Sequence, residues 1–198
     1  MLAAFVVIAH TRGTPATSLD AQGRAMLAPI RTEALRPDEL LARLHLRGTE
    51  TVADVGAGPG FFALRLARQV PRGRVIATDL RADYLAELRT HARAQDLGNI
   101  ETRLVIDPDD PTLAPRSVDI VVLAQVEHYL PDRRRYFARL ATALRPGGRI
   151  VLVNYARYRE PDLAAAAATS LHVVDGWSPS PPFFVLVLTP QEVLDADH

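Results

Sequence analysis

From residue 51 onwards, hydrophobic and polar positions follow two alternating patterns. Short apolar runs typical of buried strands alternate with segments whose apolar residues recur every three or four positions, as in amphipathic helices. The predicted strands are residues 51–55, 74–78, 100–106, 118–124 and 149–155. The predicted helices between them are residues 61–70, 82–95 and 132–144. This order predicts a parallel sheet with helices on both faces.

The 43 residues after Tyr155 have a different pattern. Residues 163–170 are rich in alanine and predict a helix, and residues 172–174 and 183–188 predict two strands. The proline-rich stretch 178–182 is expected to be the loop between them. The complete prediction is an α/β fold, Rossmann-like and doubly wound, with a mostly parallel seven-stranded sheet.

The first 48 residues lack this regularity. Glycines and prolines interrupt them, so only short helices are expected, one of them starting at Pro37 and ending before Gly48. We expect residues 1–48 to form a helical lid and residues 49–198 to form the ligand-binding domain. The apolar run at residues 2–9 is too short to span a membrane and lacks a positive n-region. It predicts a buried strand or helical turn, and hence a cytoplasmic protein, with the remnant of a signal peptide, and therefore export, as the alternative.

The amino-acid composition excludes several classes of functional site. The chain has 198 residues, 23 basic and 23 acidic side chains, a formal net charge of zero and no cysteine. Zero net charge disfavours nucleic acid as a partner, and the lack of cysteine excludes disulfides, thiolate metal sites and a cysteine nucleophile. All the basic residues are arginine, which excludes a Schiff-base lysine. No metal-binding constellation is recognisable, so no metal is expected.

The strongest motif is the segment DVGAGPG, which runs from Asp54 to Gly60 directly after a predicted strand. Glycines at this position let the backbone approach a ligand, and the following helix offers free N–H groups. The spacing is GxGxG, so the dinucleotide fingerprint GxGxxG is not matched. A tight turn without a ligand is the alternative interpretation.

Two aspartates follow at the ends of the next two predicted strands. Asp79 lies where a carboxylate accepts both hydroxyls of a ribose, although it is also suited to capping a helix. Asp107 is placed to accept the exocyclic amine of an adenine, and a proline-rich turn with capping aspartates explains it equally well.

A third group of polar side chains follows the strand at residues 118–124. Gln125, Glu127, His128 and Tyr129 come directly after it, at the edge of the sheet where the glycine segment also lies. His128 is placed for acid–base catalysis, and Glu127 and Tyr129 are candidates to bind substrate. A purely structural histidine is the alternative.

These motifs, taken in order, resemble a known family. Residues 54–60, Asp79, Asp107, the strand introduced by Ser117, and the LRPGG segment at 144–148 are similar to those of class I S-adenosylmethionine-dependent methyltransferases. Within that family the chain looks like the small-molecule branch related to quinone-biosynthesis methyltransferases. The resemblance covers about residues 36–155.

The resemblance implies a role for each matching residue. Asp54 would hold the cofactor's ammonium, Asp79 its ribose and Asp107 its adenine amine, with Gln125 near the sulfonium. The remaining implied cofactor contacts are Gly56, Ala57, Gly58, Gly60, Leu80 and Pro108. Two prolines depart from the pattern: Pro59 replaces a hydroxyl residue, and Pro108 lacks the N–H that often meets the adenine.

The predicted function is therefore methyl transfer from S-adenosylmethionine to a small-molecule acceptor, leaving S-adenosylhomocysteine. Catalysis would come mainly from positioning, with His128 as general base if the acceptor has to lose a proton. The methylated atom and the oligomeric state are left open. The alternatives are a non-catalytic S-adenosylmethionine-binding module and, less well supported, a nicotinamide-dependent enzyme.

Overall fold

Seven strands form the sheet of the protein, in a computed structural model that describes residues 19–191. Their order across the sheet is β3-β2-β1-β4-β5-β7-β6. The first five strands in this order are parallel, and β7 is antiparallel to both β5 and β6. The bounds are β1 Thr51–Val55, β2 Arg74–Asp79, β3 Ile100–Leu104, β4 Val118–Ala124, β5 Leu144–Tyr155, β6 Leu171–Trp177 and β7 Phe183–Pro190. The prediction of a mostly parallel seven-stranded sheet is confirmed.

One strand begins earlier than its hydrophobic pattern predicts. β5 starts at Leu144, which pairs with Val118, and a register shift separates this pair from the regular ladder that begins at Ile120. The Arg-Pro-Gly-Gly segment that follows the predicted helix at residues 132–144 is therefore an irregular entry into β5. Gly147, with φ +74°, accommodates the bend.

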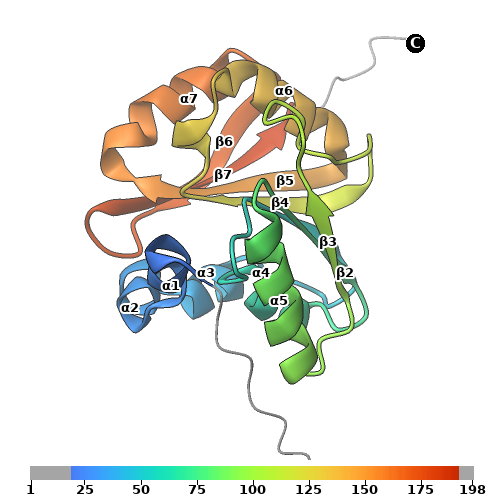
Figure 1. The fold of residues 1–198 in the computed structure, drawn as a ribbon. Helices are drawn as coiled ribbons and strands as arrows, with labels where there is room; N and C mark the ends of the chain where they lie inside the picture. The colour runs from blue at the N-terminus through green and yellow to red at the C-terminus, as the bar shows by residue number, and fades with distance from the viewer. Residues whose placement is uncertain (1–18, 192–198) are drawn as a thin grey trace, which may run out of the picture.

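The helices cover both faces of the sheet, as predicted. Two core clusters result: Leu66 and Leu88 pack against one face, and Phe137 and Leu140 against the other. In Figure 1, α4 and α5 lie on one side of the sheet and α6 and α7 on the other. The longer elements are α4 Ala63–Gln69, α5 Ala82–Ala94, α6 Arg133–Ala143 and α7 Arg159–Ala167, and the two single turns are η1 Glu127–Tyr129 and η2 Ala156–Tyr158.

Three short helices precede the sheet: α1 Ala21–Leu27, α2 Pro29–Leu35 and α3 Pro37–Arg43. Proline opens both α2 and α3, where its fixed φ suits the first helical turn. They lie beside the loop that joins β6 and β7 (Figure 1), and Ser180 Oγ in that loop donates to the carbonyl of Ala34 at 2.6 Å. The apolar run at residues 2–9 lies outside the described residues.

None of the helices described between residues 19 and 191 has the length and apolarity needed to cross a membrane.

Candidate active site

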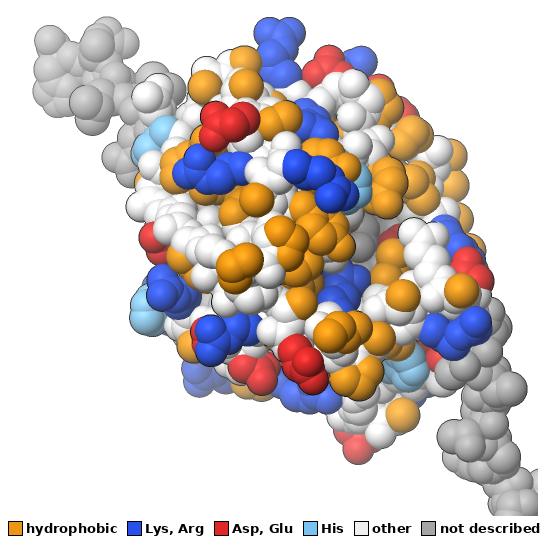
Figure 2. Space-filling model, turned by 90° about the vertical axis from the view of Figure 1, so that its left-hand side faces the viewer, with side chains coloured by type: hydrophobic (Ala, Val, Ile, Leu, Met, Phe, Trp, Pro, Cys, Tyr) orange, Lys and Arg blue, Asp and Glu red, His pale blue; other side chains and the backbone are white. Residues whose placement is uncertain are grey.

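A cavity of about 740 Å³ opens at the carboxyl edge of the parallel strands. Small-molecule sites typically occupy roughly 300–1,000 Å³ at this edge of an α/β sheet. The ends of β1, β2, β4 and β5 line the cavity together with α1 and α2 from the N-terminal segment. Figure 2, turned toward the side of α1 and α2, shows a cluster of hydrophobic side chains among arginines. The topology therefore brings the predicted ligand edge and the N-terminal helices together.

The glycine segment forms one wall of the cavity. Gly56 has φ +69°, and a Cβ there would lie 2.4 Å from Cγ2 of Val126. Gly58, with φ +56°, lies against Met26 of α1, and its N–H donates to Oδ2 of Asp79 at 2.8 Å. Gly56 and Ala57 line the cavity. Gly58 shapes the turn, and Gly60 packs against Leu88 of α5 rather than facing the cavity.

Asp54 lies at the end of β1 and is only 2% exposed. Burial raises the pKa of its carboxyl to about 7, against the lowering effects of Arg31 and of the Ala63 N–H at the start of α4. Its Oδ2 has no hydrogen-bond partner within the described residues. A buried carboxylate without a partner at a cavity wall is suited to bind a cationic group.

Arg31 of α2 is a charged cavity residue that sequence reasoning missed. Its guanidinium lies 4.7 Å from the ring centre of Phe61, and its Nε has no partner within the described residues. Burial lowers its pKa, and the negative charge of Asp54 opposes that effect. Arg31 stands 23 positions before Asp54 in a chain with 23 arginines, so no local signal separated it from the others.

Asp79 ends β2 and lines the cavity, as predicted, with Leu80 beside it 59% exposed. Both oxygens of Asp79 accept backbone N–H groups, Oδ1 from Arg81 at 2.9 Å and Oδ2 from Gly58 at 2.8 Å. Burial raises the pKa of this carboxyl, and the two hydrogen bonds oppose the rise. The carboxylate therefore ties the glycine segment to β2 and still borders the cavity.

Asp107 is not brought into this cavity. Its side chain is exposed, and Oδ1 accepts the N–H of Asp109 at 2.9 Å, which is the capping turn considered as its alternative role. It borders a separate shallow hollow with Arg139. Val105 and Pro108 line the main cavity instead, because β3 ends at Leu104 and the chain then turns outward.

The opposite wall follows β4. Gln125 has φ +63°, and the single turn η1 then presents His128 and Tyr129 to the cavity. Tyr155 and Phe183, at the ends of β5 and β7, add an aromatic pair with ring centres 4.6 Å apart. Their neighbouring positions come from the register of two strands distant in sequence, which the hydrophobic pattern alone did not reveal.

Glu127 points away from this wall, contrary to its expected role as a substrate-binding residue. It is 0% exposed, and its Oε2 accepts the N–H of Val126 at 3.1 Å. Burial raises the pKa of Glu127, and the neighbouring Asp162 of α7 raises it further. One turn of 3-10 helix cannot direct three consecutive side chains to one side, so His128 and Tyr129 face the cavity and Glu127 faces the interior.

His128 is held on several sides. Its ring stacks on Tyr158 at 4.6 Å between centres, with 8° between planes, and lies 4.1 Å from the ring of Tyr129. Its Nδ1 lies 3.2 Å from Nδ2 of Asn154. Burial lowers the pKa of the imidazole, with smaller contributions from the positive charges of Arg133 and Arg157. A neutral imidazole at the cavity wall is the result.

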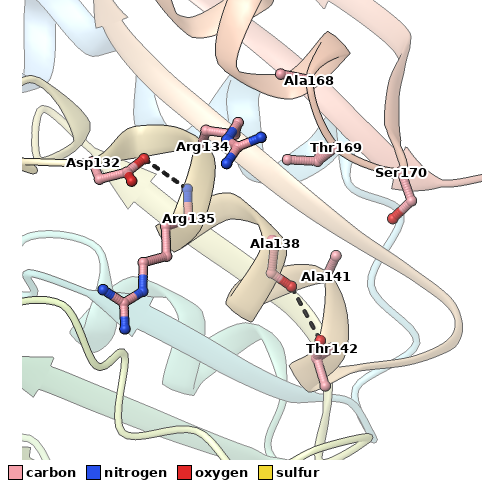
Figure 3. Close-up of a pocket in the computed structure, with 9 residues that line it drawn as sticks. All are labelled: Asp132, Arg134, Arg135, Ala138, Ala141, Thr142, Ala168, Thr169 and Ser170. Carbon is pink, nitrogen blue, oxygen red and sulfur yellow. Dashed lines mark hydrogen bonds between the residues drawn. The ribbon is translucent and has the colours of Figure 1, made fainter.

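A second hollow, between α6 and the start of β6, has no such features. Figure 3 shows that its polar groups are used locally: Asp132 caps α6 by accepting the N–H of Arg135, and Thr142 donates to the carbonyl of Ala138. None of the predicted site residues lines it. Across residues 19–191, no group of three or more His, Asp or Glu side chains has a geometry that could hold a metal ion.

Known proteins match this arrangement. The methyltransferase domain family matches residues 52–148, which run from β1 to the entry of β5 and include the glycine segment, Asp79 and His128. These residues belong to this methyltransferase family. The fold and family are those of the S-adenosylmethionine-dependent methyltransferases, whose methyl donor is S-adenosylmethionine.

Individual methyltransferases show the same relationship. A trans-aconitate 2-methyltransferase of Azoarcus sp. is 34% identical over 72% of this chain and 53% of its own length. An arsenite methyltransferase of Halobacterium salinarum is 35% identical over 52% of this chain and 26% of its own length. The chain thus spans between a quarter and about half of these relatives.

The solved structures agree on the fold. A SAM-dependent methyltransferase from Aquifex aeolicus superposes with a TM-score of 0.77 at 20% identity, covering 84% of this chain and 96% of that one. The resemblance stated from the motifs is therefore confirmed at the level of fold and family.

Proposed function

We propose that this chain transfers a methyl group from S-adenosylmethionine to a small organic molecule bound in the 740 Å³ cavity. The observation that carries the proposal is that Asp54 and Arg31 both line the cavity beside the glycine segment. A buried carboxyl and a partly buried guanidinium, each with an atom lacking a partner in the described chain, match the ammonium and carboxylate of an amino acid. A nicotinamide dinucleotide offers no such group, so the pair favours the methionine cofactor.

The other cavity residues fit the rest of that cofactor. Asp79 and Leu80, at the end of β2, would meet its ribose and one face of its adenine, and Pro108 would lie at the adenine edge. Gly56 leaves room for the methionine chain, because any side chain there would collide with Val126. When bound, the cofactor supplies a methyl group on a positively charged sulfur, which leaves as a neutral thioether in an in-line displacement.

The residues of this chain then position the acceptor. Gln125, His128 and Tyr129 face the cavity from one side, and Tyr155 and Phe183 form an aromatic wall. Holding two reactants in line can supply roughly 7–11 kcal/mol of the barrier without other chemistry. Among the relatives' named substrates, we favour an organic acid such as trans-aconitate, because the chain has no cysteine to bind thiophilic arsenic.

The N-terminal helices belong to this proposal. Residues 1–48 would act as the lid and residues 49–198 as the methyltransferase domain, which is supported by the contribution of Met26, Ile30 and Arg31 to the cavity wall. A cytoplasmic location and the absence of a nucleic-acid partner stay predictions from the sequence.

The test separates binding from turnover. S-adenosylhomocysteine at a hundred times its Kd should raise Tm by about 5–10 °C, and NAD at the same concentration should not. Labelled S-adenosylmethionine with a panel of organic acids that includes trans-aconitate should then give a labelled small product. An equal response to NAD would contradict the cofactor assignment. Tight binding without turnover on any acceptor would instead favour the non-catalytic module.

A further inference from the structure

The orientation of Asn154 is fixed by its surroundings. This residue of β5 is 0% exposed, and its Oδ1 accepts the N–H of Tyr155 at 2.8 Å. Only the oxygen of an amide can accept that N–H. The nitrogen Nδ2 must therefore be the atom that faces Nδ1 of His128 at 3.2 Å.

This contact determines which nitrogen of His128 carries the proton. An amide Nδ2 can only donate, so Nδ1 of the ring has to present a lone pair. In the neutral ring the proton is then on Nε2, which has no hydrogen-bond partner within residues 19–191. Because Nδ1 faces the buried Asn154 and the residue lines the cavity, Nε2 is the nitrogen available to a bound molecule.

Charged groups around the ring keep it neutral. Arg133 of α6 and Arg157 of η2 both disfavour the imidazolium, as burial does. The acidic groups nearby are Glu127, the chain neighbour of His128, and Asp162, whose charge acts on Glu127. Protonation of Nδ1 would place two donors face to face, so Asn154 itself opposes it.

The carboxyls of Glu127 and Asp162 interact with each other near His128. Oε1 of Glu127 and both oxygens of Asp162 are buried with no donor among the described residues, and Arg133 Nη1 lies 3.5 Å from Asp162 Oδ1. One proton shared between the two carboxyls can bridge one oxygen of each and limits the pair to a single negative charge, which faces Arg133. Neither carboxyl is among the groups that shift the pKa of His128.

We propose that His128 acts as a hydrogen-bond donor through Nε2–H to an oxygen of the methyl acceptor, and that Asn154 is the positioning residue that holds this tautomer. The proposal rests on the proposed function and narrows its substrate class. With Nε2 already protonated, His128 cannot remove a proton from the acceptor at that atom. The acceptor is therefore a molecule whose nucleophilic atom is already free of a proton, such as a carboxylate.

The position of the proton on the His128 ring can be measured without a bound methyl acceptor. Long-range ¹H–¹⁵N correlation spectra of the ¹⁵N-labelled protein distinguish the two neutral tautomers of each histidine, and the H128Q spectrum identifies the signals of His128. We expect the Nε2–H tautomer between pH 7 and 8, with the His128 pKa below its ordinary value. A spectrum with the proton on Nδ1 would overturn the proposal.

Substitutions at Asn154 test whether this residue sets the tautomer of His128. In N154D the carboxylate would accept Nδ1–H, so the proton should move to Nδ1 and the His128 pKa should rise by about 1–2 units. N154L removes the donor and adds no acceptor, so the pKa should rise much less. If N154D left both the tautomer and the pKa of a folded protein unchanged, Asn154 would have no positioning role.

Turnover tests the donor role itself, with trans-aconitate as methyl acceptor. The side-chain amide of Gln reaches the position of Nε2, whereas that of Asn reaches only Nδ1. Loss of the donor should cost about tenfold to a hundredfold in kcat, so H128N should lose at least ten times more than H128Q. Equal losses would contradict the donor role. A wild-type protein that methylates no acid would count against the proposed function, while the spectrum would still decide the tautomer.

Discussion

The two walls of the cavity are built in different ways. The wall at β1 and β2 consists of a backbone turn and two carboxylates, with Asp54, Gly56 and Asp79 within a stretch of 26 residues. The wall at β4 and β5 consists of rings and the amide of Gln125, with His128, Tyr155 and Phe183 brought together by strand pairing. A site made of backbone leaves a motif in the sequence, and a site made of converging side chains does not.

The same comparison separates two buried carboxyls. Asp54 and Glu127 are both almost fully buried, and burial raises the pKa of each. Asp54 borders the cavity opposite Arg31, whereas Glu127 faces Asp162 and the interior. A raised pKa therefore shows only that a carboxyl is buried. The groups around the carboxyl show whether a ligand can contact it.

The largest expected effect comes from removing the charge at Asp54. In D54N the ammonium of S-adenosylhomocysteine would lose its buried partner, which typically costs about 3–5 kcal/mol. Affinity measured by calorimetry should fall by about two to three orders of magnitude. A loss below tenfold would remove Asp54 from the cofactor site.

The same substitution should stabilise the empty protein at high pH. The folded pKa of Asp54 lies at about 7, above its ordinary 3.8, so ionisation costs stability as pH rises from about 4 to 7. D54N avoids this cost and should gain about 2–4 kcal/mol at pH 8 and almost nothing at pH 4. Urea unfolding at the two pH values measures the difference. An equal gain at both would show that the charge is not the cause.

A smaller loss is expected at Asp79. D79A removes the charged hydrogen bonding to the ribose hydroxyls, which is typically worth about 1.5–3 kcal/mol, so affinity should fall about tenfold to a hundredfold. The matched control is D107A, which changes an exposed aspartate outside the cavity and should alter affinity less than twofold. If D107A weakened binding as much as D79A, the adenine role implied by the motif would be restored.

The smallest effect is a dependence on pH. Asp54 must be ionised to bind an ammonium, so affinity for S-adenosylhomocysteine should rise with pH until the carboxyl is fully charged near pH 8. Between pH 8 and pH 6 the wild type should lose about tenfold. Titrations in buffers of different ionisation enthalpy should show proton release on binding at pH 7. D54N should show neither effect.

The sequence by itself determined the alternation of strands and helices, the edge of the sheet at which the cavity opens, and the family. Apolar periodicity placed the parallel strands to within two residues at most ends, because burial on both faces requires continuous apolar runs. The glycines and Asp79 were recognisable because a turn with positive φ and a carboxylate at a strand end leave few alternatives. These constraints are local, so they can be recognised from residues that are consecutive in the sequence.

Only the tertiary structure decided which side chains face the cavity. Arg31 of α2 lies at the cavity, whereas Asp107 points outward and caps a loop. The tertiary structure also directed Glu127 inward and set Asn154 against His128. Each of these outcomes depends on strand register or on the direction of a single turn, which one-residue differences reverse. The chemistry of the acceptor wall follows from that packing, since the tautomer of His128 is set by an amide 26 positions away.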